Sequence, residues 1–300
     1  MAAGIRVLSL LIALDSATVF AHPGAGIVVD LRGQIYFTDT GAGVWKVDRQ
    51  GRLTRHPGQA IHWMAIDKRG AFAQRDIPPG VAGHLSLIGP DPSLIQSSDF
   101  PIAVGRDSSL FYPQADGDRV KIMRMAPGGS PAVFAALPPI REVDPEGELK
   151  NVPWINGLAA GPGGSLYYAE RDAVRRISAE GSVSLVAGNV TVPGCTPPPA
   201  LEGSRIGTGL RGLDVMADGT IFVAASGCKA LLKIGPRGVV EVALGAEAAW
   251  TPTGVAISGD DVYVLEYWYP KSERREDWIP RVRKLSRDGK VTVIASVRRD

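Results

Sequence analysis

The chain has 300 residues, of which 45% are apolar, enough for one sizeable hydrophobic core. Its 33 Lys and Arg residues nearly balance 31 Asp and Glu residues, and no basic tract is interleaved with aromatic residues, so the composition argues against a nucleic-acid-binding protein. The 36 glycines and 23 prolines indicate many short strands and tight turns.

Residues 1–21 have the pattern of a secretory signal peptide. Arg6 precedes a short apolar run from Val7 to Leu14, and Val19-Phe20-Ala21 offers small residues for cleavage before His22. The run is too short to span a bilayer. A buried first strand or helix is the alternative interpretation. The pattern predicts an exported protein, periplasmic or secreted, with no membrane span.

A weak repeat, a turn followed by an aliphatic–aromatic strand, recurs along the rest of the chain. Five copies are clear: Gly33-Gln34-Ile35-Tyr36, Ser108-Ser109-Leu110-Phe111, Gly164-Ser165-Leu166-Tyr167, Gly219-Thr220-Ile221-Phe222 and Asp260-Asp261-Val262-Tyr263. A sixth and poorer copy is Gly70-Ala71-Phe72. Their spacing of about 45 residues suits one four-stranded propeller blade. The sequence therefore predicts an all-β fold, a single six-bladed β-propeller of four-stranded antiparallel blades over residues 22–300.

The first and last repeats both contain four β-like pieces. In the first repeat these are 26–30, 34–38, 44–48 and 53–55, and in the last they are 254–258, 261–265, 281–285 and 290–295. Because both repeats are complete, we expect no strand to be shared between the two ends of the chain. The second and third repeats are poorly registered, so the alignment places their channel residues only to within one or two positions.

Two passages carry a resemblance to a known family. Leu210-Arg211-Gly212-Leu213-Asp214-Val215, continuing through Phe222, resembles the segment that joins repeats in NHL-repeat propellers, and Pro252-Thr253-Gly254-Val255-Ala256 resembles the same motif. The resemblance is specific for fold and unspecific for function. Related six-bladed propellers are the gluconolactonase and senescence-marker family and the strictosidine-synthase-like proteins.

Long connections are expected on one face of the ring. The segments are 76–84, 138–153, 190–209 and 267–280. Each joins a second strand to a third or a fourth strand to the next blade, and strands alternate in direction, so all four emerge together. Long loops on one face favour a binding role there. The predicted partner is a small anionic molecule or another protein.

Alignment of the repeats places two sets of residues near the mouth of the channel on that face. The first set opens the first strand of each blade: Ala25, His62, Phe100, Asn156, Arg211 and Thr253. The second set ends the second strand: Asp39, Asp76, Gln114, Glu170, Ala225 and Glu266. From the first set, His62, Asn156, Arg211 and Thr253 are predicted ligand contacts, although His62 is equally compatible with a packed, hydrogen-bonded histidine. Acids of the second set are expected to satisfy turn donors, which leaves Glu170 and Glu266 as weak candidates for an acid or base.

The family resemblance implies a divalent ion held by a Glu, an Asn and an Asp. Asn156-Gly157 matches the Asn-Gly pair, but Arg211-Gly212 stands in the place of the Asp and Ala25-Gly26 in the place of the Glu. Because an arginine repels a cation, no metal or other cofactor is predicted, and calcium is disfavoured. A gluconolactonase-like hydrolase or a strictosidine-synthase-like enzyme with an altered site remains the alternative to a binding module, as does a structural role in a larger envelope assembly.

Two further features point to an exported binding protein. Cys195 and Cys228 are the two cysteines of the chain, and in an exported protein such a pair predicts a disulfide. The alternative is two unrelated buried thiols. The segment 267–280 mixes aromatic residues, among them Trp268, with charged ones, which favours a partner surface. The alternative is a loop that folds its tryptophans back onto the blade.

Overall fold

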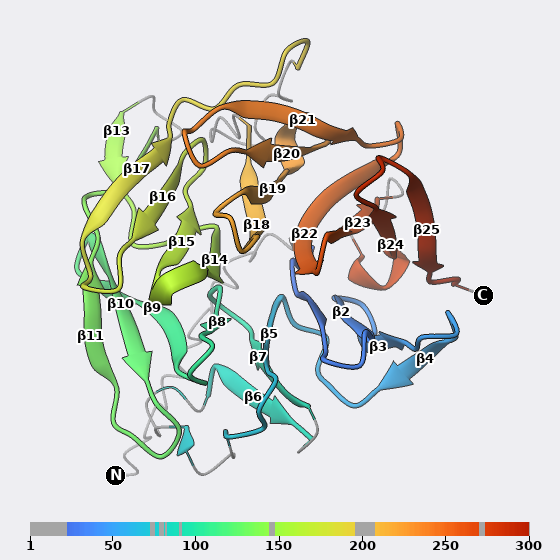
Figure 1. Ribbon diagram of the computed structural model, residues 1–300, viewed down its shortest axis with the longest axis horizontal. Coiled ribbons are helices and arrows are strands. Elements are labelled where there is room, and N and C mark those ends of the chain that lie inside the picture. The colour runs from blue at the N-terminus through green and yellow to red at the C-terminus, as the bar shows by residue number, and fades with distance from the viewer. Residues whose placement is uncertain are drawn as a thin grey trace, which may run out of the picture.

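The computed structural model describes residues 23–72, 76–77, 81, 83–89, 92–143, 148–195, 208–269 and 274–299. In these residues six small antiparallel sheets stand as blades around a central axis (Figure 1). The prediction of an all-β, six-bladed propeller is therefore confirmed. No helix in this part of the chain is long and apolar enough to cross a membrane, and the residues assigned to the signal peptide lie outside it.

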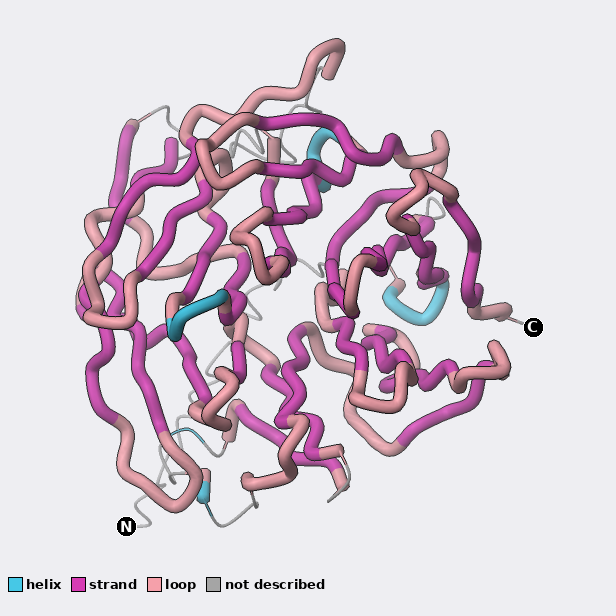
Figure 2. The backbone as a smooth tube through the Cα atoms, viewed as in Figure 1, coloured by secondary structure: helices cyan, strands magenta, loops and turns pink. Residues whose placement is uncertain are grey.

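Regular structure is almost entirely strand (Figure 2). The strands of the first three blades are β1 (Ile27–Val29), β2 (Ile35–Asp39), β3 (Gly43–Val47), β4 (Leu53–His56), β5 (Trp63–Asp67), β6 (Leu85–Ile88), β7 (Ser93–Ser97), β8 (Ala103–Val104), β9 (Leu110–Asp116), β10 (Arg119–Met125) and β11 (Ala132–Ala136). The hairpin of β12 (Arg141–Val143) and β13 (Leu149–Asn151) follows. The strands of the last three blades are β14 (Gly157–Ala160), β15 (Leu166–Ala169), β16 (Val174–Ile177), β17 (Val183–Ala187), β18 (Leu210–Val215), β19 (Ile221–Ala225), β20 (Ala230–Ile234), β21 (Val240–Gly245), β22 (Trp250–Ser258), β23 (Asp261–Trp268), β24 (Ile279–Leu285) and β25 (Val291–Ser296). Short 3-10 turns are η2 (Pro162–Gly164), η4 (Ser226–Cys228) and η5 (Arg275–Asp277).

The hydrophobic core is divided among the spaces between neighbouring blades. Six apolar clusters are present, one in each such space. The space between the third and fourth blades contains Phe111, Leu166 and Tyr168, for example. The aliphatic–aromatic strand of each repeat is buried on both sides because each sheet packs face to face with two others. That double burial explains why these strands read as continuous apolar runs.

Glycines allow the inner strands to approach one another at one end of the channel. A Cβ on Gly157 would lie 2.3 Å from the carbonyl oxygen of Arg211, and a Cβ on Gly254 would lie 2.2 Å from that of Ala25. On Gly212 it would lie 2.8 Å from the carbonyl oxygen of Thr253. Backbone therefore touches backbone from blade to blade, and only glycine fits at these positions.

The ring is closed by side-chain hydrogen bonds between the last and first blades, and among the described residues no sheet contains strands from both. The Thr253 hydroxyl donates to the carbonyl of Gly24 (2.7 Å), and the Tyr267 hydroxyl donates to the carbonyl of Thr38 (2.7 Å). Arg299 donates to the buried carboxylate of Asp39 (2.7 Å). These bonds join the two blades at the seam.

The second blade departs from the repeat. Its three described strands have the order β5-β7-β6, so β7 occupies the place that a second strand has elsewhere. The strand predicted around Gly70-Ala71-Phe72 was wrong: Phe72 is buried outside any strand, and its backbone N–H donates to Asp67 (3.0 Å). Asp67 also accepts from the N–H of Arg69, so its carboxylate holds this stretch in a turn.

Two faces of the ring can now be distinguished. The loop-rich face contains the connections from second to third strands and from fourth strands to the next blade, including β12–β13 and η5. The short-turn face contains the connections between first and second strands, including η2. The first strands of the blades run from the loop-rich face to the short-turn face.

Candidate functional site

Of the six residues expected at the loop-rich mouth of the channel, five precede or open their inner strands and Thr253 lies within β22. Their side chains have different surroundings. The Thr253 side chain is buried and bonded to Gly24 at the seam. Phe100 stacks on Tyr112, with ring centroids 6.0 Å apart, as part of the apolar cluster between the second and third blades. Ala25 offers no polar group. Of the six, His62, Asn156 and Arg211 bring polar side chains to this mouth.

Arg211 is half-buried, and its guanidinium donates to the carbonyl of Pro23 (3.2 Å). It forms no ion pair with a carboxylate in the part of the chain that the structure describes. Burial lowers the pKa of Arg211, yet a guanidinium remains charged at neutral pH. Tyr269 lies near enough to interact with this charge, and burial raises the pKa of its phenol. Arg211 is therefore a sheltered cation with donors to spare.

His62 lies close to the same charge. Its Nδ1 is 2.8 Å from the carbonyl oxygen of Ser98. Burial lowers the pKa of His62, and the charges of Arg275 and Arg211 lower it further. The imidazole is accordingly neutral at pH 7 and, with Nδ1–H donating to Ser98, would present its other nitrogen as an acceptor. This corner of the mouth is positive through its arginines and not through its histidine.

The fourth blade brings Asn156 and Glu170 to the same face. The backbone N–H of Asn156 donates to the carbonyl of Ala169 (2.8 Å), while its side-chain amide has no hydrogen bond to the described residues. Glu170 accepts from Nε of Arg175 (2.6 Å) and is largely buried. Burial raises the pKa of Glu170, against the opposing effect of Arg175. Glu170 is thus a carboxyl group that holds its proton to higher pH than an exposed glutamate does.

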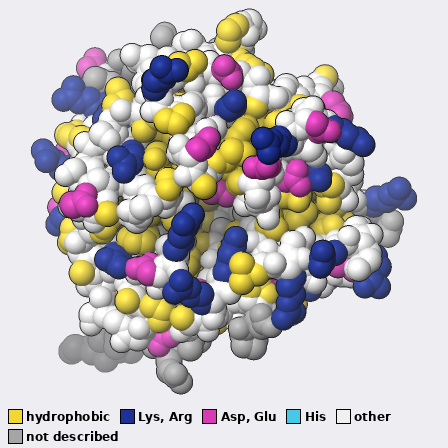
Figure 3. All heavy atoms as spheres, in the orientation of Figure 1, with side chains coloured by type: hydrophobic (Ala, Val, Ile, Leu, Met, Phe, Trp, Pro, Cys, Tyr) yellow, Lys and Arg dark blue, Asp and Glu magenta, His cyan; other side chains and the backbone are white. Residues whose placement is uncertain are grey.

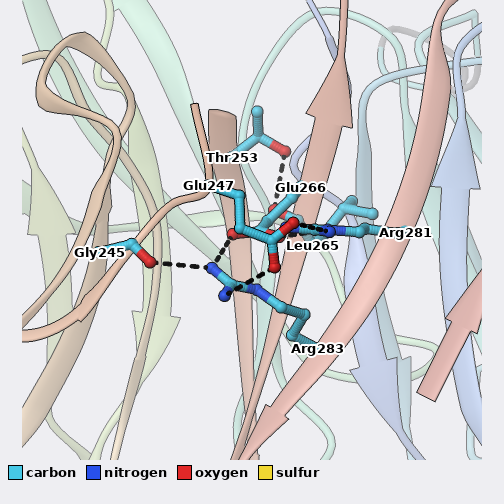
Figure 4. A network of polar contacts seen from close by, with 7 residues as sticks. All are labelled: Gly245, Glu247, Thr253, Leu265, Glu266, Arg281 and Arg283. Atoms are coloured by element: carbon cyan, nitrogen blue, oxygen red, sulfur yellow. Dashed lines mark hydrogen bonds and ion pairs between the residues drawn. The ribbon is translucent and has the colours of Figure 1, made fainter. Parts of the chain in front are cut away.

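Glu266 has a different environment, a network of buried ions between the fifth and sixth blades (Figure 4). Its carboxylate is 0% exposed and accepts from Nε of Arg281 (2.7 Å) and from Nη2 of Arg283. Glu247, which is 60% exposed, binds Nη1 of Arg281 (2.8 Å) at the outer side of the network. The Arg281 guanidinium also lies 3.9 Å above the ring of Trp250. Both oxygens of Glu266 are therefore occupied by structural partners.

The aromatic residues of the segment 267–280 that the structure describes divide between core and surface. Tyr267 and Trp278 are buried in the cluster between the sixth and first blades, and Tyr269 packs against Trp278 with ring centroids 5.3 Å apart. Trp268 is 37% exposed. The fold-back interpretation holds for Trp278, while Trp268 leaves a partly exposed ring on the outside.

The predicted disulfide between Cys195 and Cys228 is present. It joins the segment after β17 to η4, beside the loop-rich face. The segment 196–207, which carries much of the predicted long loop, lies outside the described residues.

Sequence reasoning missed one acid in the channel, Asp214. It lies on the inner strand β18, and its carboxylate accepts from the N–H groups of Val215 (2.8 Å) and Ile257 (2.7 Å), the latter on the neighbouring blade. Burial raises the pKa of Asp214 from 3.8 to about 6. The strand pairing shows which residues of the other five inner strands are equivalent to Asp214, and all of them are Val or Ala: Val28, Ala65, Ala103, Ala159 and Ala256. An acid at a position that is apolar in every other repeat was the signal in the sequence that could have identified Asp214.

A divalent ion of the kind implied by the family resemblance does not fit this mouth. The guanidinium of Arg211 and the methyl of Ala25 stand where two oxygen ligands would be required, and calcium takes oxygen ligands. Within the described residues no group of three or more His, Cys, Asp or Glu side chains is arranged to hold a metal.

No protein-family model matches the sequence, and no curated protein matches it significantly. Solved structures match in fold. A protein designated a gluconolactonase shares 18% identity, with a TM-score of 0.50 and coverage of 80% of this chain and 84% of that one. Virginiamycin B lyase from Staphylococcus aureus shares 14% identity (TM-score 0.49, coverage 90% and 83%), and the calcium-binding protein regucalcin from Agrobacterium tumefaciens shares 14% (TM-score 0.45, coverage 81% and 81%).

At such identities the likeness extends to architecture alone. The chain is a six-bladed β-propeller, similar in fold to the protein designated a gluconolactonase.

Proposed function

We propose that this protein is a binding module that holds a small anionic molecule at the loop-rich mouth of its channel, with Arg211 as the principal contact. The observation that supports this most is a half-buried guanidinium whose hydrogen-bond acceptor is a backbone carbonyl and not a carboxylate. A desolvated cation is costly without a counter-charge, and a guanidinium presents a planar fork of donors that matches a carboxylate or phosphate. A bound anion would supply the missing charge.

Neighbouring groups suit the same ligand. The free amide of Asn156 can donate to a second oxygen of the ligand. Arg275 adds positive charge close to His62. The neutral His62 would accept a hydrogen bond from a hydroxyl or a protonated acid. These groups favour a small, multiply oxygenated anion over a purely apolar compound.

We also propose that the protein is exported. The disulfide supports this, because such bonds persist in oxidising compartments, and the pattern of residues 1–21 agrees with it. A protein partner on the loop-rich face, with Trp268 in the contact, is the other form that binding would take.

The test uses the chain from His22 onward, made under oxidising conditions. Acetate, succinate, citrate, sulfate and phosphate are titrated by calorimetry, and the melting temperature is followed with each. We expect at least one anion to bind and Arg211→Gln to weaken it at least tenfold. Arg237→Gln, on a turn of the opposite face, is the matched control and should change nothing.

Asn156→Ala is the second variant, in case Arg211→Gln fails to fold. It should weaken the same anion severalfold. Metal content is measured in parallel, with chelator and with added calcium. A stoichiometric ion whose removal lowers the melting temperature would overturn the proposal and return the site to lactonase-like chemistry.

One observation favours an enzyme as the second candidate. Burial raises the pKa of Glu170, and a raised carboxyl pKa is the direction that suits a general acid. If hydrolysis of a simple sugar lactone is detected and Glu170→Gln abolishes it while the circular dichroism spectrum is unchanged, the enzyme interpretation replaces the binding module.

A further inference from the structure

The central channel of the ring is itself a cavity of the described structure. It has a volume of about 640 Å³ and is lined by the inner strands of all six blades. Its lining extends from Ala25 and Gly212, near the loop-rich end, to the short turns that contain Leu31, Arg69 and Met216. Inner strands touch one another at Gly157, Gly212 and Gly254, near the loop-rich end, whereas the cavity lining continues as far as the short turns. A volume of this size accommodates a small organic molecule.

The walls of the channel are mostly aliphatic. Five of the six inner strands have Val or Ala at the level of Asp214, and the next residue along is Ile66, Val104 or Ile257 in three of them. Small side chains at one level leave the space that forms the cavity. Asp214 is the single acid at that level, because the equivalent residues of the other five blades are apolar.

The wall of the channel and its short-turn rim carry charged side chains of opposite sign. Asp214 lies in the wall, whereas Lys68, Arg69 and Arg106 stand on the turns that follow β5 and β8, at the short-turn rim of the same cavity. None of the three cations forms an ion pair with a carboxylate of the described residues. Figure 3, which views the ring down its axis, shows basic side chains around a central hollow.

We propose that this channel is a second binding site, entered from the short-turn face, for an extended zwitterion whose ammonium group reaches Asp214 while its carboxylate stays at the rim with Lys68 and Arg106. The aliphatic walls take the methylene chain that separates the two charges. A simple anion would have its charge placed correctly at the rim but would bring no positive charge to Asp214, whose carboxylate accepts from two backbone N–H groups and has the charge of Lys68 in range. A simple cation would be repelled by the rim.

A series of probes with equal chains and different ends separates these cases. 6-Aminohexanoate, hexanoate and hexylamine are titrated by calorimetry into the oxidised protein at pH 7.5, with shorter and longer amino acids of three to eight carbons. We expect one of the amino acids to bind at least tenfold more tightly than the hexanoate and hexylamine analogues of similar length. Equal affinity for hexanoate, or no binding by any member of the series, would overturn the proposal.

Variants assign the two ends. Asp214→Asn should weaken the amino acid at least tenfold and leave any weak hexanoate binding unchanged or tighter. Asp214→Ala, which gives this blade the residue found at the same level in four others, is the second variant if the amide disturbs the strand. The double variant Lys68→Gln, Arg106→Gln should also weaken binding at least tenfold, and Arg237→Gln should not.

Arg211→Gln, at the loop-rich mouth, distinguishes the channel site from the anion site proposed at that mouth. It should leave affinity for the amino acid unchanged. A loss with Arg211→Gln, or an unchanged affinity with both Asp214 variants, would show that the amino acid binds elsewhere and refute the channel site.

Discussion

Removing the charge of Glu266 tests the network between the fifth and sixth blades. In Glu266→Gln, two guanidinium groups that are only 6% and 5% exposed lose their shared buried counter-ion. Breaking a buried ion pair in this way costs about 3–5 kcal/mol. At roughly 2–4 °C per kcal/mol for a domain of this size, the melting temperature should fall by about 10 °C.

Glu247→Gln is the matched control, because Glu247 binds the same Arg281 from a position that is 60% exposed. An exposed ion pair contributes about 0–1 kcal/mol, so this variant should be nearly as stable as the wild type. Urea unfolding of the oxidised protein, followed by circular dichroism, gives both free energies.

A third variant separates charge from packing. Replacing Glu266 and Arg281 by Met and Arg283 by Leu removes all three buried charges at once, and such replacements are often neutral or stabilising. We expect it to recover most of the stability lost in Glu266→Gln. A loss below about 1 kcal/mol for Glu266→Gln, or one equal to that of Glu247→Gln, would refute this account of the network and make Glu266 available for chemistry again.

Three further predictions concern other parts of the fold. In Gly157→Ala the new Cβ would lie 2.3 Å from the carbonyl oxygen of Arg211, so the free energy of unfolding should fall by about 1–3 kcal/mol. Gly245→Ala is the control, because a Cβ there meets open space, and its free energy of unfolding should fall by less than about 1 kcal/mol. Urea unfolding measures both, and a larger loss at Gly245 than at Gly157 would contradict this account. The double variant Cys195→Ser, Cys228→Ser removes a disulfide with a sequence separation of 33, and its free energy of unfolding should be about 3–4 kcal/mol lower than that of the wild type. An unchanged unfolding midpoint would contradict this prediction. The pKa of Asp214 is about 6 in the folded protein, above its ordinary 3.8, so the folded state binds the proton more tightly than the unfolded state does. At pH 7.5 the ionised carboxylate therefore lowers the free energy of unfolding by up to about 3 kcal/mol. This loss is relieved as the pH falls toward 4. The difference in unfolding free energy between wild type and Asp214→Asn should therefore change between pH 7.5 and pH 5, and a constant difference would argue against the shift.

The architecture was largely readable from the sequence because the repeat is local. Ile35-Tyr36 and Leu166-Tyr167 fall within β2 and β15, where one residue pattern specifies both turn and strand. The second blade was misread because its second-position strand comes from 93–97, far from the turn at Asp67. A pattern within one segment does not reveal which later segment will pair with it.

The candidate site was less readable, since its chemistry depends on side chains that meet across blades. The place of Arg211 at the mouth followed from the alignment of repeats, but its lack of a carboxylate partner among the described residues did not. The partners of Glu266 lie 15 and 17 residues further on. Two arginines alternating with apolar residues in β24, Arg281 and Arg283 on either side of Val282, were the available signal of a buried counter-ion.

The strand order β5-β7-β6 has a consequence for how the ring assembles. Five blades can form as successive hairpins, each strand pairing with the one that has just been made. In the second blade, β5 pairs with β7 and not with β6, the strand that follows it in the chain. β5 can therefore pair only after β7 has been made, and 25 residues separate the end of β5 at Asp67 from the start of β7 at Ser93. Contacts between distant segments form slowly. We therefore expect this blade to complete last, so that the channel between its neighbours stays open to solvent until the β6–β7 hairpin docks.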